Sequence, residues 1–435
     1  MTIRQEILDL VAKFAETQQA RQPFAPGTTS IPASGKVIGK DEIVTLVDAA
    51  LDGWLTAGRY NDLFEKKLGE YIGVEHVLTT NSGSSANLLA ISALTSPQLG
   101  ERALVAGDEV ITAAAGFPTT INPILQNGLV PVFVDSDIPT YNPTPTQIEA
   151  AIGPKTKAII IAHTLGNPFA VAEVREIADR HGLWLVEDCC DALGSTYRGK
   201  KVGTFGHIGT LSCYPAHHIT MGEGGAVYTA DPLLRRLLES FRDWGRDCWC
   251  PPGKENTCGK RYQWQFGSLP DGYDHKYVYA HAGYNLKITD MQAALGVAQL
   301  DRIDDFCNAR KKNFEKLHDR LTALEEFLIL PKATLNSDPS WFGFPISIRE
   351  SAGCNRIDLL RYLDEHRIGT RLIFAGNVTR QPYFAGRNYR VSGTLENADF
   401  IMKNTFHIGT FPGIDDEMID YVAERIGQFF GLGFD

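Results

Sequence analysis

Short apolar runs that alternate with helical patterns constrain the fold of this 435-residue chain more than any other feature. Four runs of β-branched and other apolar residues are typical of buried strands, at residues 108–114, 130–137, 157–163 and 183–190. Residues 171–182 have the spacing of an amphipathic helix between the last two runs, and residues 41–55 have the same period. Continuous apolar strands joined through helices indicate a mostly parallel sheet covered on both faces. Ligands of such sheets bind in the loops that follow the strands.

The length predicts more than one domain, because single hydrophobic cores stop growing near about 250 to 300 residues. Residues 1–35 are expected to form an N-terminal helix, over residues 1–22, and an irregular extension outside the core that is rich in Pro, Gly and Ser. We expect a large cofactor-binding α/β domain over residues 36–320, with a long helical pattern at 288–324, and a smaller C-terminal α/β domain over residues 321–435 that contains a strand at 341–348.

Residues 246–284 interrupt the pattern of the large domain. They have no clear period and are rich in Gly, Pro and aromatic residues. A loop of this length inside a compact domain is usually functional or disordered. Its Trp and Tyr content favours an ordered, functional loop.

Charge and hydropathy exclude several classes of partner. The 42 Lys and Arg against 52 Asp and Glu give a net charge of −10, without a basic run, so nucleic acid is not an expected partner. The N-terminus lacks the apolar core of a signal peptide, and no apolar run approaches the roughly 20 residues of a membrane span. We therefore expect a cytoplasmic protein without a membrane partner. The eight cysteines of such a chain indicate metal or redox chemistry rather than disulfides.

Polar residues follow several of the expected strands. Gly83 lies among small hydroxyl residues ahead of a helical pattern, an arrangement that suits a phosphate, although a plain Ser N-cap explains it equally. Asp188 and Asp191 end a buried strand, where a carboxylate is often structural but can also hold a pyridinium nitrogen protonated. The stretch from Ser212 to Gly225 reads as a strand end and a glycine-rich turn, with two adjacent histidines at its centre.

The order of these pieces resembles the sugar-nucleotide aminotransferase-like family of fold-type I pyridoxal-phosphate enzymes. The resemblance is carried by residues 81–91, 107–125, 131–142, 162–168, 186–195, 209–229 and 282–296. It implies an aminotransferase-like α/β fold and a homodimer whose active sites lie at the subunit interface. The implied cofactor contacts are Gly83, Ser84 and Ser212 at the phosphate, Phe117 on the ring, Asp188 at the ring nitrogen, and Asn285 from the partner subunit. Taken alone, Phe117 reads as a core aromatic and Asn285 as a turn residue.

The Schiff-base lysine of that family is missing here. In the family it lies six residues before the glutamate of the GEGG turn, which is the position of His217. No lysine occurs between Lys201 and Lys254, so a shift of register cannot restore one. Histidine, with a pKa of about 6.5, can move a proton at neutral pH but cannot hold the cofactor aldehyde. We therefore expect the cofactor to be pyridoxamine 5′-phosphate (PMP), bound noncovalently in place of covalently held PLP, with His217 as the base. The alternatives are His218 as the base and a regulatory fold without catalysis.

Histidine at this position resembles the sugar 3-dehydratases of the family, which remove the C3 hydroxyl of a 4-keto-6-deoxyhexose nucleotide. One branch has no metal, and the other carries an iron–sulfur cluster. The C-x57-C-x-C-x7-C spacing of Cys190, Cys248, Cys250 and Cys258 matches the iron–sulfur branch, which implies a [2Fe–2S] cluster. A structural zinc site and inert buried thiols are the alternatives. Four further cysteines are expected to be small core residues: Cys189, Cys213, Cys307 and Cys354.

The resemblance implies C3 deoxygenation of CDP-4-dehydro-6-deoxyglucose in 3,6-dideoxyhexose (O-antigen) synthesis, with electrons from a partner NADH-dependent flavin and iron–sulfur reductase. Asp191 and Tyr214 would favour dehydration over amino transfer. Arg371, Arg380 and Tyr383 are candidate contacts for the substrate, although arginines there could equally be solvated surface. The alternatives for the whole chain are a cluster-free enzyme similar to GDP-4-keto-6-deoxymannose 3-dehydratase and a nonenzymatic iron–sulfur redox sensor.

Overall fold

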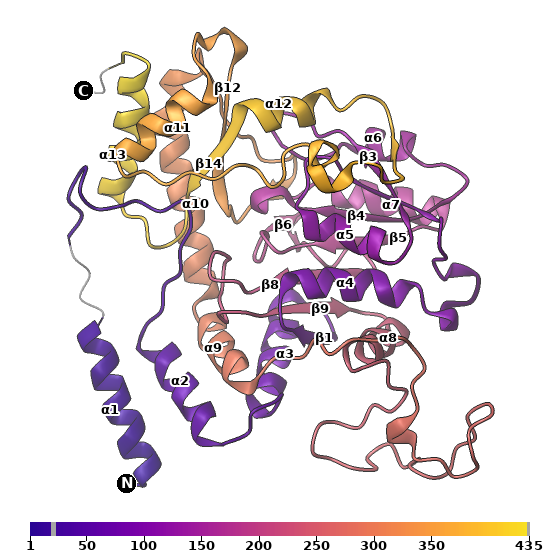
Figure 1. Cartoon of the computed structure of the whole chain (residues 1–435). Helices are drawn as coiled ribbons and strands as arrows, with labels where there is room; N and C mark the ends of the chain where they lie inside the picture. Colours follow the sequence, from indigo (N-terminus) through magenta and orange to yellow (C-terminus); the bar gives the residue numbers. More distant parts are fainter. Residues whose placement is uncertain (19–22, 433–435) are drawn as a thin grey trace.

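The computed structural model describes residues 1–18 and 23–432 and is centred on one large sheet (Figure 1). In spatial order its strands are β1 (His76–Thr80), β9 (Gly225–Thr229), β8 (Ile208–Ser212), β5 (Trp184–Asp188), β4 (Thr156–Ala162), β2 (Glu109–Ala113), β3 (Val130–Val134) and β13 (Arg390–Val391). Strand β9 is antiparallel to both neighbours, and the other adjacent strands are parallel. The mostly parallel sheet that the apolar runs predict is therefore confirmed.

Helices cover both faces of this sheet, which explains why its strands are apolar throughout. The core on one face includes α4 (Gly83–Leu94), α5 (Pro118–Gln126) and α8 (Pro232–Arg242), and the core on the other includes α6 (Pro145–Ala150) and α7 (Val171–His181). In β4, Ile160 is buried in the first core, whereas Ile159 and Ile161 are buried in the second. Successive side chains of a strand point to opposite faces, so an unbroken apolar run is what a doubly covered strand requires.

The N-terminal part packs on the β1 end of the molecule and on the C-terminal part. Helix α9 (Asp290–Leu300) contacts both α2 (Lys40–Leu51) and α3 (Arg59–Ile72), and α1 (Ile3–Gln18) lies along α2. Residues 19–22 of the predicted N-terminal helix lie outside the described residues. The extension was expected to lie outside the core, but part of it is buried. Ile31 is buried and pairs with Ile368, and Ala33 is also buried.

The C-terminal part is built on a second sheet in the order β10 (Leu328–Ile329), β12 (Gly343–Ile348) and β14 (Thr405–Gly409). Its helices are α10 (Ile303–Leu321), α11 (Arg356–Glu365), α12 (Glu396–Asn404) and α13 (Asp416–Phe429). Strand β13 leaves this part and pairs with β3 at the edge of the large sheet. The long helical pattern at 288–324 is divided between α9 and α10, because the chain leaves helical geometry at Arg302 (φ −114°, ψ 7°).

Smaller elements complete the chain. A short sheet joins β11 (Ser337–Asp338), β6 (Thr196–Tyr197) and β7 (Lys200–Lys201). The 3-10 helices are η1 (Pro97–Arg102), η2 (Thr164–Gly166), η3 (His275–Tyr277), η4 (Thr322–Leu324), η5 (Glu350–Ala352), η6 (Val378–Arg380) and η7 (Pro382–Phe384). Among the helices of residues 1–18 and 23–432, none is long and apolar enough to cross a membrane.

The segment between α8 and α9 forms a long excursion beyond α8 (Figure 1). Its base is closed by bridges between Asp243 and Asn285 and between Arg246 and Tyr279. Its tip has little regular structure apart from η3, in agreement with the missing periodicity. We call residues 246–284 the cysteine loop.

Candidate active site

A pocket opens where several parallel strands of the large sheet end. Its walls come from the start of α4, from the loops after β2, β5 and β8, and from the C-terminal part of the chain. The residues that line the pocket include Gly83, Ser84, Asn87, Phe117, Asp188, Cys190, Asp191, Ser212, Tyr214, His217, Phe342, Arg371, Leu372, Phe374 and His407. This is the edge at which ligands of parallel sheets bind.

The start of α4 forms a narrow end of the pocket that suits a phosphate. Ser82 caps the helix by accepting a hydrogen bond from the Ser85 backbone N–H, and the Ser84 hydroxyl lies 3.1 Å from the Thr119 hydroxyl. A Cβ atom on Gly83 would lie 2.5 Å from Ser212 Cβ and 2.8 Å from Cys190 Sγ, so only glycine fits. Backbone N–H groups and the positive end of the helix dipole therefore face a small space.

Asp188 is the buried carboxylate of the pocket. Its Oδ2 accepts hydrogen bonds from Asn87 Nδ2 at 2.8 Å and from Thr120 Oγ1 at 2.7 Å, and its Oδ1 accepts one from the Cys190 backbone N–H at 3.1 Å. The side chain of Asn87 is itself fixed, because its Oδ1 accepts a hydrogen bond from Thr210. Neutral donors thus orient a carboxylate that lines the cavity, as a ring-nitrogen partner requires.

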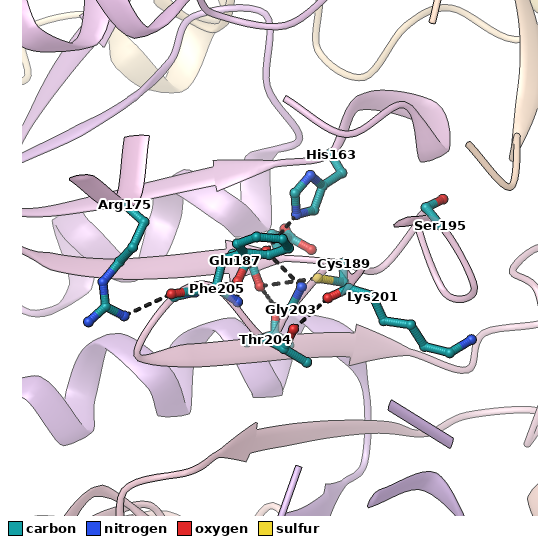
Figure 2. Close-up of polar contacts among 12 residues, drawn as sticks. His163, Arg175, Glu187, Cys189, Ser195, Lys201, Gly203, Thr204 and Phe205 are labelled. Atoms are coloured by element: carbon teal, nitrogen blue, oxygen red, sulfur yellow. Dashed lines mark hydrogen bonds and ion pairs between the residues drawn. The ribbon is translucent and has the colours of Figure 1, made fainter. Parts of the chain in front are cut away.

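Glu187, the residue before Asp188 in β5, is hydrogen-bonded to the loop that contains Gly203, as Figure 2 shows. The buried Glu187 carboxylate accepts hydrogen bonds from the backbone N–H groups of Gly203, Phe205 and Gly206, and His163 Nε2 lies 3.1 Å from its Oε2. These contacts fasten β5 to the loop before β8. Backbone donors occupy both carboxylate oxygens, so the cluster is structural.

His217 and Asp191 face each other in the pocket, with Nδ1 3.1 Å from Oδ1. The loop that carries His217 is fixed by its backbone, because Arg310 Nη2 donates a hydrogen bond to the His217 carbonyl at 3.2 Å. Arg310 is fully buried in α10 and also donates to the carbonyls of Trp341 and Phe342. The imidazole is therefore placed from two sides.

His218 has a different environment from its neighbour. It is buried, and its Nε2 lies 2.8 Å from the Ser340 carbonyl. Burial lowers the pKa of His218 well below its ordinary value. His217 lines the pocket and His218 does not. Among the described residues that line the pocket, there is no lysine.

Phe117 and Tyr214 form exposed walls of the pocket. Phe117 precedes α5, is 46% exposed, and contacts Phe374 edge-on with ring centroids 6.0 Å apart. Tyr214 is 52% exposed and its backbone N–H donates to Ser212 Oγ at 3.3 Å. The mouth of the pocket is thus aromatic and open on one side.

The structure separates the predicted substrate residues. Arg371 lines the pocket, but Arg380 and Tyr383 do not. Arg380 forms an ion pair with Asp399 at 2.8 Å, and Tyr383 follows it in η7. Asn285 also lies outside this pocket in the single chain, in a hollow beside the cysteine loop.

Several residues escaped the sequence analysis: Asn87 and His407 line the pocket, and Thr120 and Arg310 support residues that do. Asn87 follows Gly83 by one helical turn, a spacing that could have indicated a shared face. Thr120 follows the start of α5, and His407 is a polar residue inside the buried strand β14. Burial lowers the pKa of His407 to about 4, so its imidazole is neutral at neutral pH. No local signal connects Arg310 or His407 with the other pocket residues, because they come from distant parts of the chain.

The predicted cluster ligands do not all lie together in one chain. Cys190 lines the pocket, whereas the other three lie in the cysteine loop. The Cys258 backbone N–H donates to Cys250 Sγ at 3.4 Å, and the ligand atoms of Cys248, Cys258 and His275 lie within 4.8 Å of one another. Burial raises the pKa of the Cys250 thiol, but hydrogen bonds from Thr257 and from the Cys258 backbone N–H outweigh burial and bring it to about 7.

The remaining cysteines are mostly in the core. Cys189, Cys213 and Cys307 are buried, and Cys354 is partly buried against the C-terminal core. His275 is the potential ligand that the sequence analysis missed. It is fully buried, its Nε2 lies 2.7 Å from Asp247 Oδ2, and its ring stacks on Trp264 with centroids 5.0 Å apart.

The fold and the pocket define a fold-type I pyridoxal-phosphate enzyme of the aminotransferase type. The DegT/DnrJ/EryC1/StrS aminotransferase family matches residues 36–427, and the chain belongs to this family. The resemblance inferred from the separated segments is therefore confirmed.

Three known proteins illustrate how similar the chain is to other members of the family. It is 64% identical over 432 residues to the lipopolysaccharide biosynthesis protein RfbH of Salmonella typhimurium, covering 99% of each chain. It is 55% identical to the dTDP-4-dehydro-2,6-dideoxy-D-glucose 3-dehydratase of Saccharopolyspora spinosa, over 95% of this chain and 89% of that one. The solved structure of Escherichia coli GDP-4-keto-6-deoxy-D-mannose-3-dehydratase with bound hydrated PLP has a TM-score of 0.82 and 29% identity, over 91% of this chain and 98% of that one.

Proposed function

We propose that the chain is a sugar-nucleotide 3-dehydratase that uses noncovalent PMP. The observation that carries the proposal is His217, which lines the pocket beside Asp191 where the family has its lysine. Two of the relatives are named 3-dehydratases, one acting on a dTDP sugar and one on a GDP sugar. When bound, PMP supplies an amine for the substrate ketone and a ring that withdraws electrons.

The residues of the pocket would divide the work of binding. The start of α4 and Ser212 would bind the cofactor phosphate, and the Asp188 carboxylate would face the ring nitrogen. The space that only Gly83 fits and the two side-chain donors that orient Asp188 support this assignment. Phe117 would cover one face of the ring and exclude water from it.

His217 would move the proton. Its Nδ1 faces Asp191, which leaves Nε2 as the atom that accepts a proton from the cofactor carbon C4′ and returns it. Asp191 would hold the ring in this orientation, as the carboxylate of a catalytic triad holds its histidine. Arg371 is the cation of the pocket that could contact the substrate diphosphate.

Exchange of the C4′ proton of PMP with deuterated water, in the presence of a 4-keto sugar nucleotide that condenses with the cofactor amine, tests this role by mass spectrometry of the released cofactor. His217→Asn should lower the exchange rate by about 10²- to 10⁴-fold, the usual contribution of a general base. His218→Gln is the matched control, since Gln can still contact the Ser340 carbonyl, and it should leave exchange near the wild-type rate. Unchanged exchange in His217→Asn, or loss in His218→Gln alone, would contradict the proposal.

We further propose the [2Fe–2S] cluster, CDP-4-dehydro-6-deoxyglucose as the substrate, a homodimer, and an NADH-dependent flavin and iron–sulfur reductase as the electron donor in O-antigen synthesis. The cysteine spacing and the grouped thiols of the cysteine loop support the cluster. In one chain as described, the four thiols do not all lie in the same hollow.

A cluster-free dehydratase is the second candidate, favoured by the position of Cys190 away from the cysteine loop and by the 32% identity with the GDP-4-keto-6-deoxy-D-mannose 3-dehydratase of Escherichia coli O55:H7. Iron and sulfide assays on anaerobically purified protein distinguish the two. Turnover of CDP, dTDP and GDP forms of the 4-keto sugar, with and without the reductase, identifies the nucleotide.

A further inference from the structure

The cysteine loop groups three of the four thiols that the spacing predicts as cluster ligands. Cys248, Cys250 and Cys258 surround one small hollow, and a [2Fe–2S] cluster needs four protein ligands. His275 is the other potential ligand in that hollow: its Nδ1 lies 3.6 Å from Cys258 Sγ, its Nε2 faces Asp247, and its ring is stacked on Trp264 and Phe266, but it is not one of the four thiols of the predicted spacing. The thiol that completes the predicted spacing, Cys190, lies in the cofactor pocket instead.

Within the described chain, Cys190 and the three thiols of the cysteine loop line different hollows. Cys190 follows β5 and packs beside Gly83 at the start of α4, whereas the loop extends beyond α8 on the far side of β8 and β9 (Figure 1). The two ends of the loop are bridged to each other, by Asp243 to Asn285 and by Arg246 to Tyr279.

The surface of the cysteine loop and of the segments at its base exposes large apolar and basic side chains. Six large side chains on it are more than a third exposed: Leu55, Trp244, Tyr262, Tyr273, Tyr277 and Tyr279. Beside them, Cys248, Cys250 and Asn285 line a hollow together with four basic residues, Arg246, Lys254, Lys276 and Lys287. Clusters of exposed aromatic residues are typical of protein interfaces.

The hollow contains more positive charge than its acidic neighbours balance. Lys287 lies 3.9 Å from Asp243, and Lys276 lies 3.4 Å from Glu255. The buried Nε of Arg246 has no hydrogen-bond partner among the described residues. The hollow therefore complements an anionic surface, and a pocket that holds a phosphate-bearing cofactor is such a surface.

The mouth of the cofactor pocket is the matching surface. Phe117, Tyr214 and Leu372 line it and are each close to half exposed. Cys190 lines the same pocket and is partly exposed. An isologous dimer would place the loop of each chain over the pocket of the other, because a twofold axis makes both contacts at once.

We infer that each cluster is bound between two subunits, by Cys190 of one chain and by Cys248, Cys250 and Cys258 of a second copy. The inference rests on the proposed cluster. The exposed face of the cysteine loop would then contact a second copy of this chain. It also explains why one chain groups three of the predicted ligands and leaves the fourth in the cofactor pocket.

Mixed dimers test the inference through iron content and the visible absorption of the cluster. Cys190→Ser and Cys258→Ser chains carry different affinity tags, and the mixed dimer is isolated on both. If the ligands come from two subunits, this dimer contains one intact set and should hold half of the wild-type iron. Each homodimer of a single variant should hold none, and PMP binding by the Cys258→Ser homodimer serves as the control for folding.

A second mixed dimer reverses the expectation. It pairs a wild-type chain with a chain that carries both substitutions, so no intersubunit set is intact and iron should be absent. Iron at half the wild-type level in this dimer, and none in the first, would overturn the inference and assign the ligands to one chain. Full iron in the Cys190→Ser homodimer would overturn the inference, because Cys190 would then not be a ligand. An iron-free wild-type protein would refute the proposed cluster itself, and with it the sharing of ligands between subunits.

Discussion

Substitution of Gly83 by alanine probes the phosphate end of the pocket most directly. The added methyl group would lie 2.5 Å from Ser212 Cβ, 3.0 Å from Ser212 Cα and 2.8 Å from Cys190 Sγ. Carbon atoms in contact are about 3.5 to 4.0 Å apart, so the end of β8 or the start of α4 must move by about 1 Å. Such overpacking costs about 1 to 3 kcal/mol. The groups that move are the proposed phosphate ligands, so we expect the Kd for PMP to rise about 5- to 150-fold.

Equilibrium dialysis of the apoprotein against PMP measures this change, and urea unfolding of the same sample separates it from loss of the fold. Gly153→Ala is the matched control. The nearest atoms to its added methyl group, Arg390 Nη2 and Glu109 Oε2, lie 3.5 Å away, at ordinary contact distance. It should bind PMP like the wild type. A Gly83→Ala protein that unfolds at a lower urea concentration but keeps the wild-type Kd would refute the assignment of this end of the pocket to the phosphate.

Two further predictions concern histidines. His217→Lys should convert exchangeable binding of PLP into retention that survives dialysis and becomes permanent after borohydride reduction, whereas His218→Lys should not, because position 218 faces the Ser340 carbonyl. Burial lowers the pKa of His207 to about 4 in the folded protein, whereas the pKa of a histidine in the unfolded chain is about 6.5. As the pH falls, His207 is therefore protonated in the unfolded chain first. The free energy of unfolding should therefore decline between about pH 6.5 and 4, by up to about 3 kcal/mol from this residue, and His207→Gln should flatten the decline in urea titrations; an equally steep slope in the variant would contradict the burial argument.

The sequence predicted the central strands because their environment is uniform. Ile159, Ile160 and Ile161 are apolar on both faces, and such a run has few alternatives to a covered strand. Strand β1, in contrast, contains threonines, and β9 begins at Gly225, so neither has a distinctive apolar run. Their positions follow from antiparallel pairing with each other, which is a long-range property.

The site was predictable where local geometry determines it. The glycine ahead of α4 and the acidic residues at the end of β5 are local patterns, whereas their roles and the choice of His217 came from the resemblance to the family. Arg380 was a weaker prediction because its ion pair with Asp399 depends on how η6 packs against α12. Arg310 could not be found in this way, since its role depends on carbonyl groups that lie 31 to 93 residues away along the chain.

Arg310 also links α10 and the segment before β12 to the loop that carries His217. It belongs to α10, whose later residues are packed in the core of the C-terminal part, and its guanidinium donates to the carbonyls of His217, Trp341 and Phe342. A shift of the C-terminal part over an arriving sugar nucleotide would therefore pull on the backbone beside the proposed base. The guanidinium that holds this backbone in place would thus make the alignment of the base depend on how the C-terminal part sits over the nucleotide.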